Sequence, residues 1–249
     1  MLRELGNLWK DGTIMRTVVK TVAQMVVDAE CVYTRAWDVC AGVEDAAVAV
    51  EDAVREHDRA VNRNEREIRR MVVEHLAINP GKDAAGCLAM VLMAKDAERM
   101  GDHAKNIFEL GQRVGDKPIR EMIFYARLNG LRAEIGAQLP KLRQAILASD
   151  ETLARELLES YRRLKRVCGK LLDDLYSSDQ VTVPEAITTA MLLRNLKRVN
   201  SNVGNIASGV IFPLQNIDFV GRGLREERDE KASRQTFAPD SEQEGDDDT

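Results

Sequence analysis

Glycine, proline and aromatic residues are scarce in this chain of 249 residues. It contains 16 glycines and 6 prolines, and only 4% of its residues are aromatic. A protein with many β-strands needs turn residues about every ten positions and more aromatic and β-branched side chains. These low counts, together with 31% charged residues, exclude that class and favour long helices.

Long apolar runs are also missing. The longest, residues 84–94, is much shorter than the roughly 20 residues that cross a bilayer, so we expect peripheral contact with a membrane at most. No signal-peptide pattern opens the sequence, which predicts a cytoplasmic location. The four cysteines, Cys31, Cys40, Cys87 and Cys168, form no CxxC pair. Reduced thiols in a helical core are their simplest interpretation.

The net charge of −5 is concentrated at one end of the chain. Residues 225–249 contain ten acids and four bases, which leaves the rest of the chain almost neutral. The end of the chain has too little apolar surface to fold alone, so we expect residues 219–249 to be a disordered acidic tail. A near-neutral body without a basic stripe argues against binding to nucleic acid.

The body divides into amphipathic segments in which apolar residues recur every three or four positions. This spacing predicts helices over residues 13–42, 45–78, 83–114, 118–148, 151–178 and 183–212. No segment alternates with period two, so no sheet is expected. Residues 1–12 place Leu2, Leu5, Leu8 and Trp9 on one side. They predict a short amphipathic helix that packs on the bundle or offers a surface to a partner or membrane.

The two halves of the body repeat each other. Residues 97–107 (AERMGDHAKNI) align with residues 196–206 (LKRVNSNVGNI), which indicates an internal repeat of about a hundred residues. We therefore expect an all-α protein of two tandem antiparallel three-helix bundles, residues 13–115 and 116–218, joined end to end.

Polar residues at four-residue spacing mark two of the expected helices. They are Asp58 and Asn62 on the second helix, and Glu98, Asp102 and Asn106 on the third. Residues four apart share a helix face, so antiparallel packing would let these oxygen ligands converge, with Glu65 close by. Oxygen ligands without thiolate suit hard cations such as magnesium, calcium, manganese or iron. The alternative interpretation is a solvated polar face.

Other candidate chemistry is weak. Gly101 lies within the third-helix stripe, where it admits a neighbouring backbone or an ion, or is simply a small residue at a packed crossing. His57, His75 and His103 form no metal motif; surface or hydrogen-bonded histidine is the preferred interpretation. Nucleophile elbows, Walker loops and dinucleotide motifs are absent from the sequence, which argues against an enzyme and an organic cofactor.

The first half contains the segments EHDRAVNRNEREIRRMVVEHLAINP (56–80) and AKDAERMGDHAKNI (94–107), with Asp83 between them. In this order and at this distance, these residues resemble the PhoU family of phosphate-uptake regulators. Its two-repeat plan covers most of residues 13–215, strongly in the first repeat and weakly in the second. The resemblance implies paired three-helix bundles that hold metal through (E/D)xxxD motifs. It also implies a cytoplasmic negative regulator that couples a phosphate ABC transporter to a sensor histidine kinase, or one that accompanies a sodium-phosphate symporter.

The sequence departs from the family pattern at one position of the first repeat and at several positions of the second. Lys197 stands where the first repeat has Glu98, and Ser201 stands where it has Asp102. No acid occupies positions 162–165, the counterparts of Asp58, and the usual Arg after Asp83 is missing. We therefore expect at most one cation, such as iron, manganese, magnesium or zinc, in the first repeat. Its predicted ligands are Asp58, Asn62, Glu98 and Asp102, with Asn106 a weaker candidate.

The leading hypothesis is a non-enzymatic cytoplasmic regulator of phosphate uptake. Its expected partner is a phosphate ABC transporter ATPase, a phosphate-sensing histidine kinase or a sodium-phosphate symporter, and a homodimer is compatible with this interpretation. The alternatives are a metal-handling helical protein, or a structural adaptor that has lost metal binding. The sequence does not distinguish among the partners or the metals.

Overall fold

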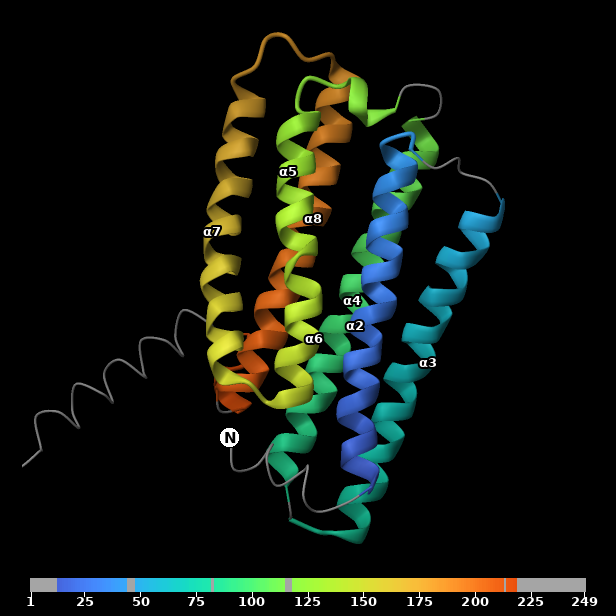
Figure 1. Cartoon of the computed structure of the whole chain (residues 1–249), viewed down its shortest axis with the longest axis vertical. Coiled ribbons are helices and arrows are strands. Elements are labelled where there is room, and N and C mark those ends of the chain that lie inside the picture. Colours follow the sequence, from blue (N-terminus) through green and yellow to red (C-terminus); the bar gives the residue numbers. More distant parts are fainter. Residues whose placement is uncertain (1–12, 44–47, 82, 115–117, 213, 219–249) are drawn as a thin grey trace, which may run out of the picture.

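The computed structural model describes residues 13–43, 48–81, 83–114, 118–212 and 214–218. In these ranges it contains helices and no strand (Figure 1). The α-helices are α2 (Thr13–Cys40), α3 (Val48–Ile78), α4 (Ala84–Val114), α5 (Tyr125–Gly136), α6 (Gln138–Ala148), α7 (Glu151–Tyr176) and α8 (Val183–Ile211), and the 3₁₀ turns are η1 (Ile119–Glu121) and η2 (Leu214–Asn216). The predicted N-terminal helix and acidic tail lie outside the described residues.

Local sequence signals explain where the later helices begin. Before α7, Ser149 adopts a left-handed conformation (φ 50°) that ends α6, and the Asp150 carboxylate accepts a hydrogen bond from the Leu153 N–H at 3.0 Å. Before α8, Glu185 accepts a hydrogen bond from the Thr182 N–H at 3.2 Å, and Pro184 occupies the first turn. Both starts follow the predicted boundaries closely.

The single helix predicted over residues 118–148 was wrong. The chain there forms η1, a turn, and the two helices α5 and α6, which meet at Ala137. Pro140 explains the break between α5 and α6. It has no N–H to donate, and in a continuous helix its ring would clash with the carbonyl group four residues earlier, at Gly136. Within the first turn of α6, where the N–H groups need no helical partner, Pro140 is tolerated.

The helices form two three-helix bundles that lie side by side (Figure 1). Helices α2, α3 and α4 pack together, and α7 and α8 pack with the α5–α6 pair. The expected end-to-end junction was wrong, because α4 packs along α8 and α2 packs along α6. Helix α8 is buried on several faces, for example at Leu192, Leu193 and Leu196, and one bundle cannot cover such a wide apolar surface.

Aromatic residues of α2 anchor the second bundle. The Tyr33 hydroxyl donates a hydrogen bond to the Arg132 carbonyl oxygen at 2.9 Å. The Trp37 indole N–H donates to the Asn129 side chain at 3.0 Å, and its ring stacks on Tyr125 with centroids 6.5 Å apart. Buried aromatic rings with satisfied polar atoms fix an orientation as well as burying area. Among the described helices, none combines the length and apolar character required to cross a membrane.

Candidate functional site

Helices α3 and α4 bring three of the predicted carboxylates into electrostatic contact. Burial raises the pKa of Asp102, and the nearby negative charges of Glu98 and Asp58 raise it further. Asn62 lies one turn from Asp58 and donates its amide to the Asp58 carbonyl oxygen at 3.0 Å. Asn106, one turn beyond Asp102, is exposed. Spacing of four residues therefore places Glu98 and Asp102 on one face of α4, and the packing of α3 against α4 brings the charge of Asp58 near them.

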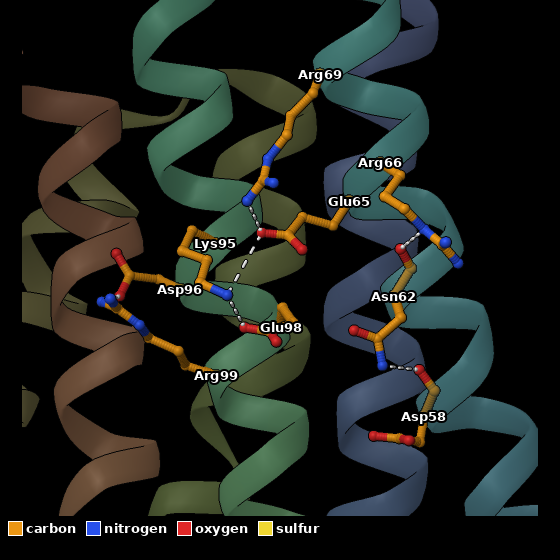
Figure 2. Close-up of polar contacts among 9 residues, drawn as sticks. All are labelled: Asp58, Asn62, Glu65, Arg66, Arg69, Lys95, Asp96, Glu98 and Arg99. Atoms are coloured by element: carbon orange, nitrogen blue, oxygen red, sulfur yellow. Dashed lines mark hydrogen bonds and ion pairs between the residues drawn. The ribbon is translucent and has the colours of Figure 1, made fainter.

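Two lysines lie among these carboxylates. The Lys95 ammonium group is 2.7 Å from Glu98 on its own helix and 3.6 Å from Glu65 on α3 (Figure 2). The Lys105 ammonium group is 3.3 Å from the Asp58 carboxylate. Both lysines thus connect α3 to α4. We call these five residues, with Asp102, the carboxylate–lysine cluster: Asp58, Glu65, Lys95, Glu98, Asp102 and Lys105.

Glu65 is the most buried acid of the cluster, with 7% of its surface exposed. It also pairs with Arg69, one turn further along α3 (Figure 2). A buried carboxylate between two cations is compensated, whereas an isolated one would carry a large desolvation penalty. Glu65 was expected only to lie close to the predicted ligands, but it pairs with both Arg69 and Lys95 and so links α3 to α4. Lys95 was missed, although its position three residues before Glu98 is a readable signal.

The oxygen donors of the cluster have the chemistry that a hard cation prefers. Within the described ranges, however, no group of three or more His, Cys, Asp or Glu side chains has an arrangement that could hold a metal ion. Lys95 and Lys105 supply the positive charge that a cation would otherwise supply. A cation bound among the carboxylates would compete with these ion pairs. Metal binding at Asp58, Asn62, Glu98, Asp102 and Asn106 stays a prediction.

The corresponding faces of the second bundle lack this cluster. On α8, the Ser201 hydroxyl donates to the Lys197 carbonyl oxygen at 2.9 Å, and Lys197 is exposed. On α7, Arg163 pairs with Glu134 of α5. Basic and neutral side chains therefore stand where the first bundle has carboxylates, and the two bundles differ in chemistry despite their common plan.

Two of the three histidines have polar partners, and the three do not share a site. His75 is 5% exposed, and its Nε2 atom has no hydrogen-bond partner in the described part of the chain, so the interpretation as a surface or hydrogen-bonded histidine was wrong for His75. The His57 ring nitrogen is 3.4 Å from the Asp28 carboxylate on α2. His103 contacts the Asn195 side chain on α8 at 3.2 Å, across the junction between the bundles. Burial lowers the pKa of His103 despite the opposing hydrogen bond to Asn195, and the positive charge of Arg198 lowers it further.

A second polar group, absent from the sequence prediction, lies between α4 and α8. Asp96 is 2% exposed, and its carboxylate accepts a hydrogen bond from Asn205 at 3.2 Å. Arg99 lies 3.8 Å from the same oxygen, on the side of α4 away from Glu98 (Figure 2). Burial raises the pKa of Asp96 to about 7, and the negative charge of Asp218 contributes. An acid between Ala94 and Ala97 is the only sequence signal for this site.

The chain is similar to known proteins of one family, both in sequence and in fold. Residues 42–111, which include α3 and most of α4, match the family model described as the PhoU domain. The crystal structure of PhoU from Pseudomonas aeruginosa is similar, with a TM-score of 0.70, 21% identity, and coverage of 84% of this chain and 98% of that one.

The phosphate transport system regulatory protein PhoU from Streptococcus pneumoniae gives a TM-score of 0.62 at 17% identity, with coverage of 85% of this chain and 95% of that one. No curated protein matches the chain. The chain therefore contains a PhoU domain, and its described helices share the fold of these PhoU structures.

Proposed function

We propose that this chain is a non-enzymatic cytoplasmic regulator of phosphate transport. The observation that carries the proposal is the match of residues 42–111 to the PhoU domain. This range includes α3 and most of α4, the two helices that carry the carboxylate–lysine cluster. One similar structure is named a phosphate transport system regulatory protein, which supports the same reading.

A regulator of this type acts by binding one state of its partner more tightly than another. The proposed partner is a phosphate ABC transporter ATPase, a phosphate-sensing histidine kinase or a sodium-phosphate symporter. The cluster suits such a contact because Lys95 and Lys105 are each 37% exposed and already paired to carboxylates. A charged partner surface could exchange these internal ion pairs for pairs across an interface, which favours orientation and specificity.

The test uses the full-length chain in cells grown at high and low phosphate. Deletion of the gene should derepress phosphate uptake at high phosphate, and the tagged wild-type chain should restore repression and capture a transporter or kinase component. Glu98→Gln with Asp102→Asn should weaken capture. Glu156→Gln with Glu159→Gln, two exposed acids on α7, is the control and should behave as wild type. Unchanged uptake on deletion, with no such component captured, would refute the proposal.

Metal handling is a second candidate function, favoured by the proximity of Asp58, Glu98 and Asp102. A cation bound among these carboxylates would neutralise Glu98 and Asp58, which now pair with Lys95 and Lys105. Elemental analysis of the purified full-length chain should find a stoichiometric metal that the variant Asp58→Asn, Glu98→Gln, Asp102→Asn loses. Metal-free protein with normal regulation would instead support a structural adaptor.

A further inference from the structure

One exposed face of α3 is rich in arginine. Its exposed members are Arg55, Arg59, Arg63, Arg66, Arg69 and Arg70. A body without a basic stripe was expected from the near-neutral charge, and for α3 this expectation was wrong. Acids alternate with the arginines along the sequence, but the helical spacing of three and four residues gathers the arginines on one face.

Half of these arginines are neutralised by acids of the same helix. The pairs are Arg55 with Glu51, Arg69 with Glu65, and Arg70 with Glu67 and Glu74. Arg59, Arg63 and Arg66 form no ion pair with any carboxylate in the part of the chain that the structure describes. We call these three residues the arginine stripe. They line a shallow surface hollow beside Asn62, and Arg66 donates a hydrogen bond to the Asn62 carbonyl oxygen at 3.3 Å (Figure 2).

The chain itself contains a segment of the opposite charge. Residues 235–249 hold six acids and no base: Asp240, Glu242, Glu244, Asp246, Asp247 and Asp248. Carboxylates are the natural partners of guanidinium groups, which bind them through two parallel hydrogen bonds. A nucleic acid fits the stripe less well, because the same acidic segment would repel its phosphates.

The described chain ends beside α4, the helix that packs against α3. The Asp218 N–H donates to the Ser208 hydroxyl at 3.1 Å, and its carboxyl group lies beside Asp96 of α4. The preceding residue of α4, Lys95, is 3.6 Å from Glu65 on α3. The end of η2 is therefore about one helix from α3, and packed helix axes are about 8–10 Å apart. About 28 residues separate Asp218 from Asp246. A chain of that length would span about 30 Å on average if it behaved as a random coil.

We propose that residues 235–249 bind the arginine stripe of the same molecule. The tail then covers α3 beside the carboxylate–lysine cluster, and an acidic partner segment must displace it to reach Arg59, Arg63 and Arg66. If residues 219–249 are disordered, as their composition predicts, the tether would give the tail an effective concentration on the order of millimolar. Weak carboxylate–guanidinium contacts would then suffice for substantial occupancy. The proposal concerns the isolated chain and is independent of its role in phosphate transport.

The first test is NMR spectroscopy of the full-length chain at low ionic strength. The backbone amides of Asp246, Asp247 and Asp248 should shift in the variant Arg59→Gln, Arg63→Gln, Arg66→Gln, and raising the salt to about 0.5 M should produce the same shifts, because it screens surface charges. Glutamine and arginine have similar helix propensities, so α3 is retained. The control changes three exposed bases of the second bundle, Lys141→Gln, Arg166→Gln and Lys170→Gln, and should leave these amides unchanged.

The second test measures the reaction of arginine with phenylglyoxal, located by mass spectrometry. Neutralising the tail acids (Asp240→Asn, Glu242→Gln, Glu244→Gln, Asp246→Asn, Asp247→Asn, Asp248→Asn) should speed modification of the arginine stripe by about two- to fourfold, as expected for a cover in place half to three quarters of the time. Modification of Arg166 should not change. Tail amides that do not respond to the stripe variant would overturn the proposal. Shifts that depend on protein concentration would also overturn it, because they would place the tail on a second molecule.

Discussion

Two glycines of α4 provide a sharp test of the packing between the helices. A Cβ atom at Gly111 would lie 2.8 Å from the Cys40 Sγ atom and 3.0 Å and 3.1 Å from the Cys40 backbone N and Cα atoms. Because backbone atoms of α2 cannot move aside cheaply, α2 and α4 would have to separate. A Cβ atom at Gly101 would meet only the Val61 side chain, at 3.9 Å, which is ordinary contact.

These distances predict opposite effects of the same substitution. Replacing a mid-helix glycine with alanine stabilises a helix by about 1 kcal/mol. Overpacking a close crossing costs about 1–3 kcal/mol. Gly111→Ala also displaces the Cys40 thiol from its hydrogen bond to the Ile107 carbonyl oxygen, at 2.9 Å. We therefore expect Gly101→Ala to raise the free energy of unfolding by about 0.5–1 kcal/mol, and Gly111→Ala to lower it by about 1–2 kcal/mol.

The assay is urea denaturation followed by circular dichroism, with the m-value checked for constancy. Gly169→Ala on α7 supplies the baseline, because nothing lies within 4 Å of its new methyl group. If Gly111→Ala stabilises as much as Gly169→Ala, the close approach of α2 and α4 is wrong. If Gly101→Ala destabilises, the space beside Gly101 is occupied, and the interpretation of room for an ion regains support.

Two further predictions concern titrating groups. Burial raises the pKa of Asp96 from 3.8 to about 7, with help from the Asp218 carboxylate, so the folded protein keeps a proton that the unfolded chain releases. The stabilisation that comes from this bound proton is fully present below pH 3.8 and is lost as the pH rises through about 7. In Asp96→Asn, the urea midpoint should therefore fall less steeply with pH than in the wild type. An unchanged dependence of the midpoint on pH would contradict the burial of Asp96. Burial also raises the pKa of the Cys40 thiol to about 12 and of the Cys87 and Cys168 thiols to about 11, so native protein should take up iodoacetamide on partly exposed Cys31 alone. Mass spectrometry counts the labels, Cys31→Ser should take up none, and two or more labels on folded wild-type protein would refute the assignment.

Much of the fold could be predicted from the sequence because it depends on local patterns. Apolar spacing of three and four residues, helix caps such as Asp150, and the break at Pro80 locate most helix boundaries within a few residues. The interruption near Ala137 was readable from Pro140 but was overlooked. The lateral arrangement of the bundles was not readable, because the apolar faces of α4 and α8 show that two partners are needed without showing which ones.

The candidate site was predicted less completely, for an electrostatic reason. Helical spacing placed Glu98 and Asp102 on one face of a helix, and the electrostatic influence of Asp58 reaches Asp102 through the packing of α3 on α4. The spacing did not show that Lys95 pairs with Glu98 and Lys105 with Asp58, because a four-carbon side chain can pair along its own helix or across to the next. Oxygen spacing alone identifies a place where positive charge is needed. Whether a metal or an ammonium group supplies that charge depends on packing across two helices.

Helix α4 connects the features of the molecule that bear on regulation. Its α3 side contributes Lys95 and Glu98 to the carboxylate–lysine cluster, while Asp96 and His103 meet Asn205 and Asn195 of α8. A partner bound at the cluster is therefore one helix thickness from the junction between the bundles. A packed helix moves as a unit, so a partner that shifts α4 toward α3 must strain or break the Asp96 and His103 contacts with α8. Loss of both polar contacts should therefore weaken the coupling between the two bundles, and the apolar packing of α4 on α8 would carry what remains.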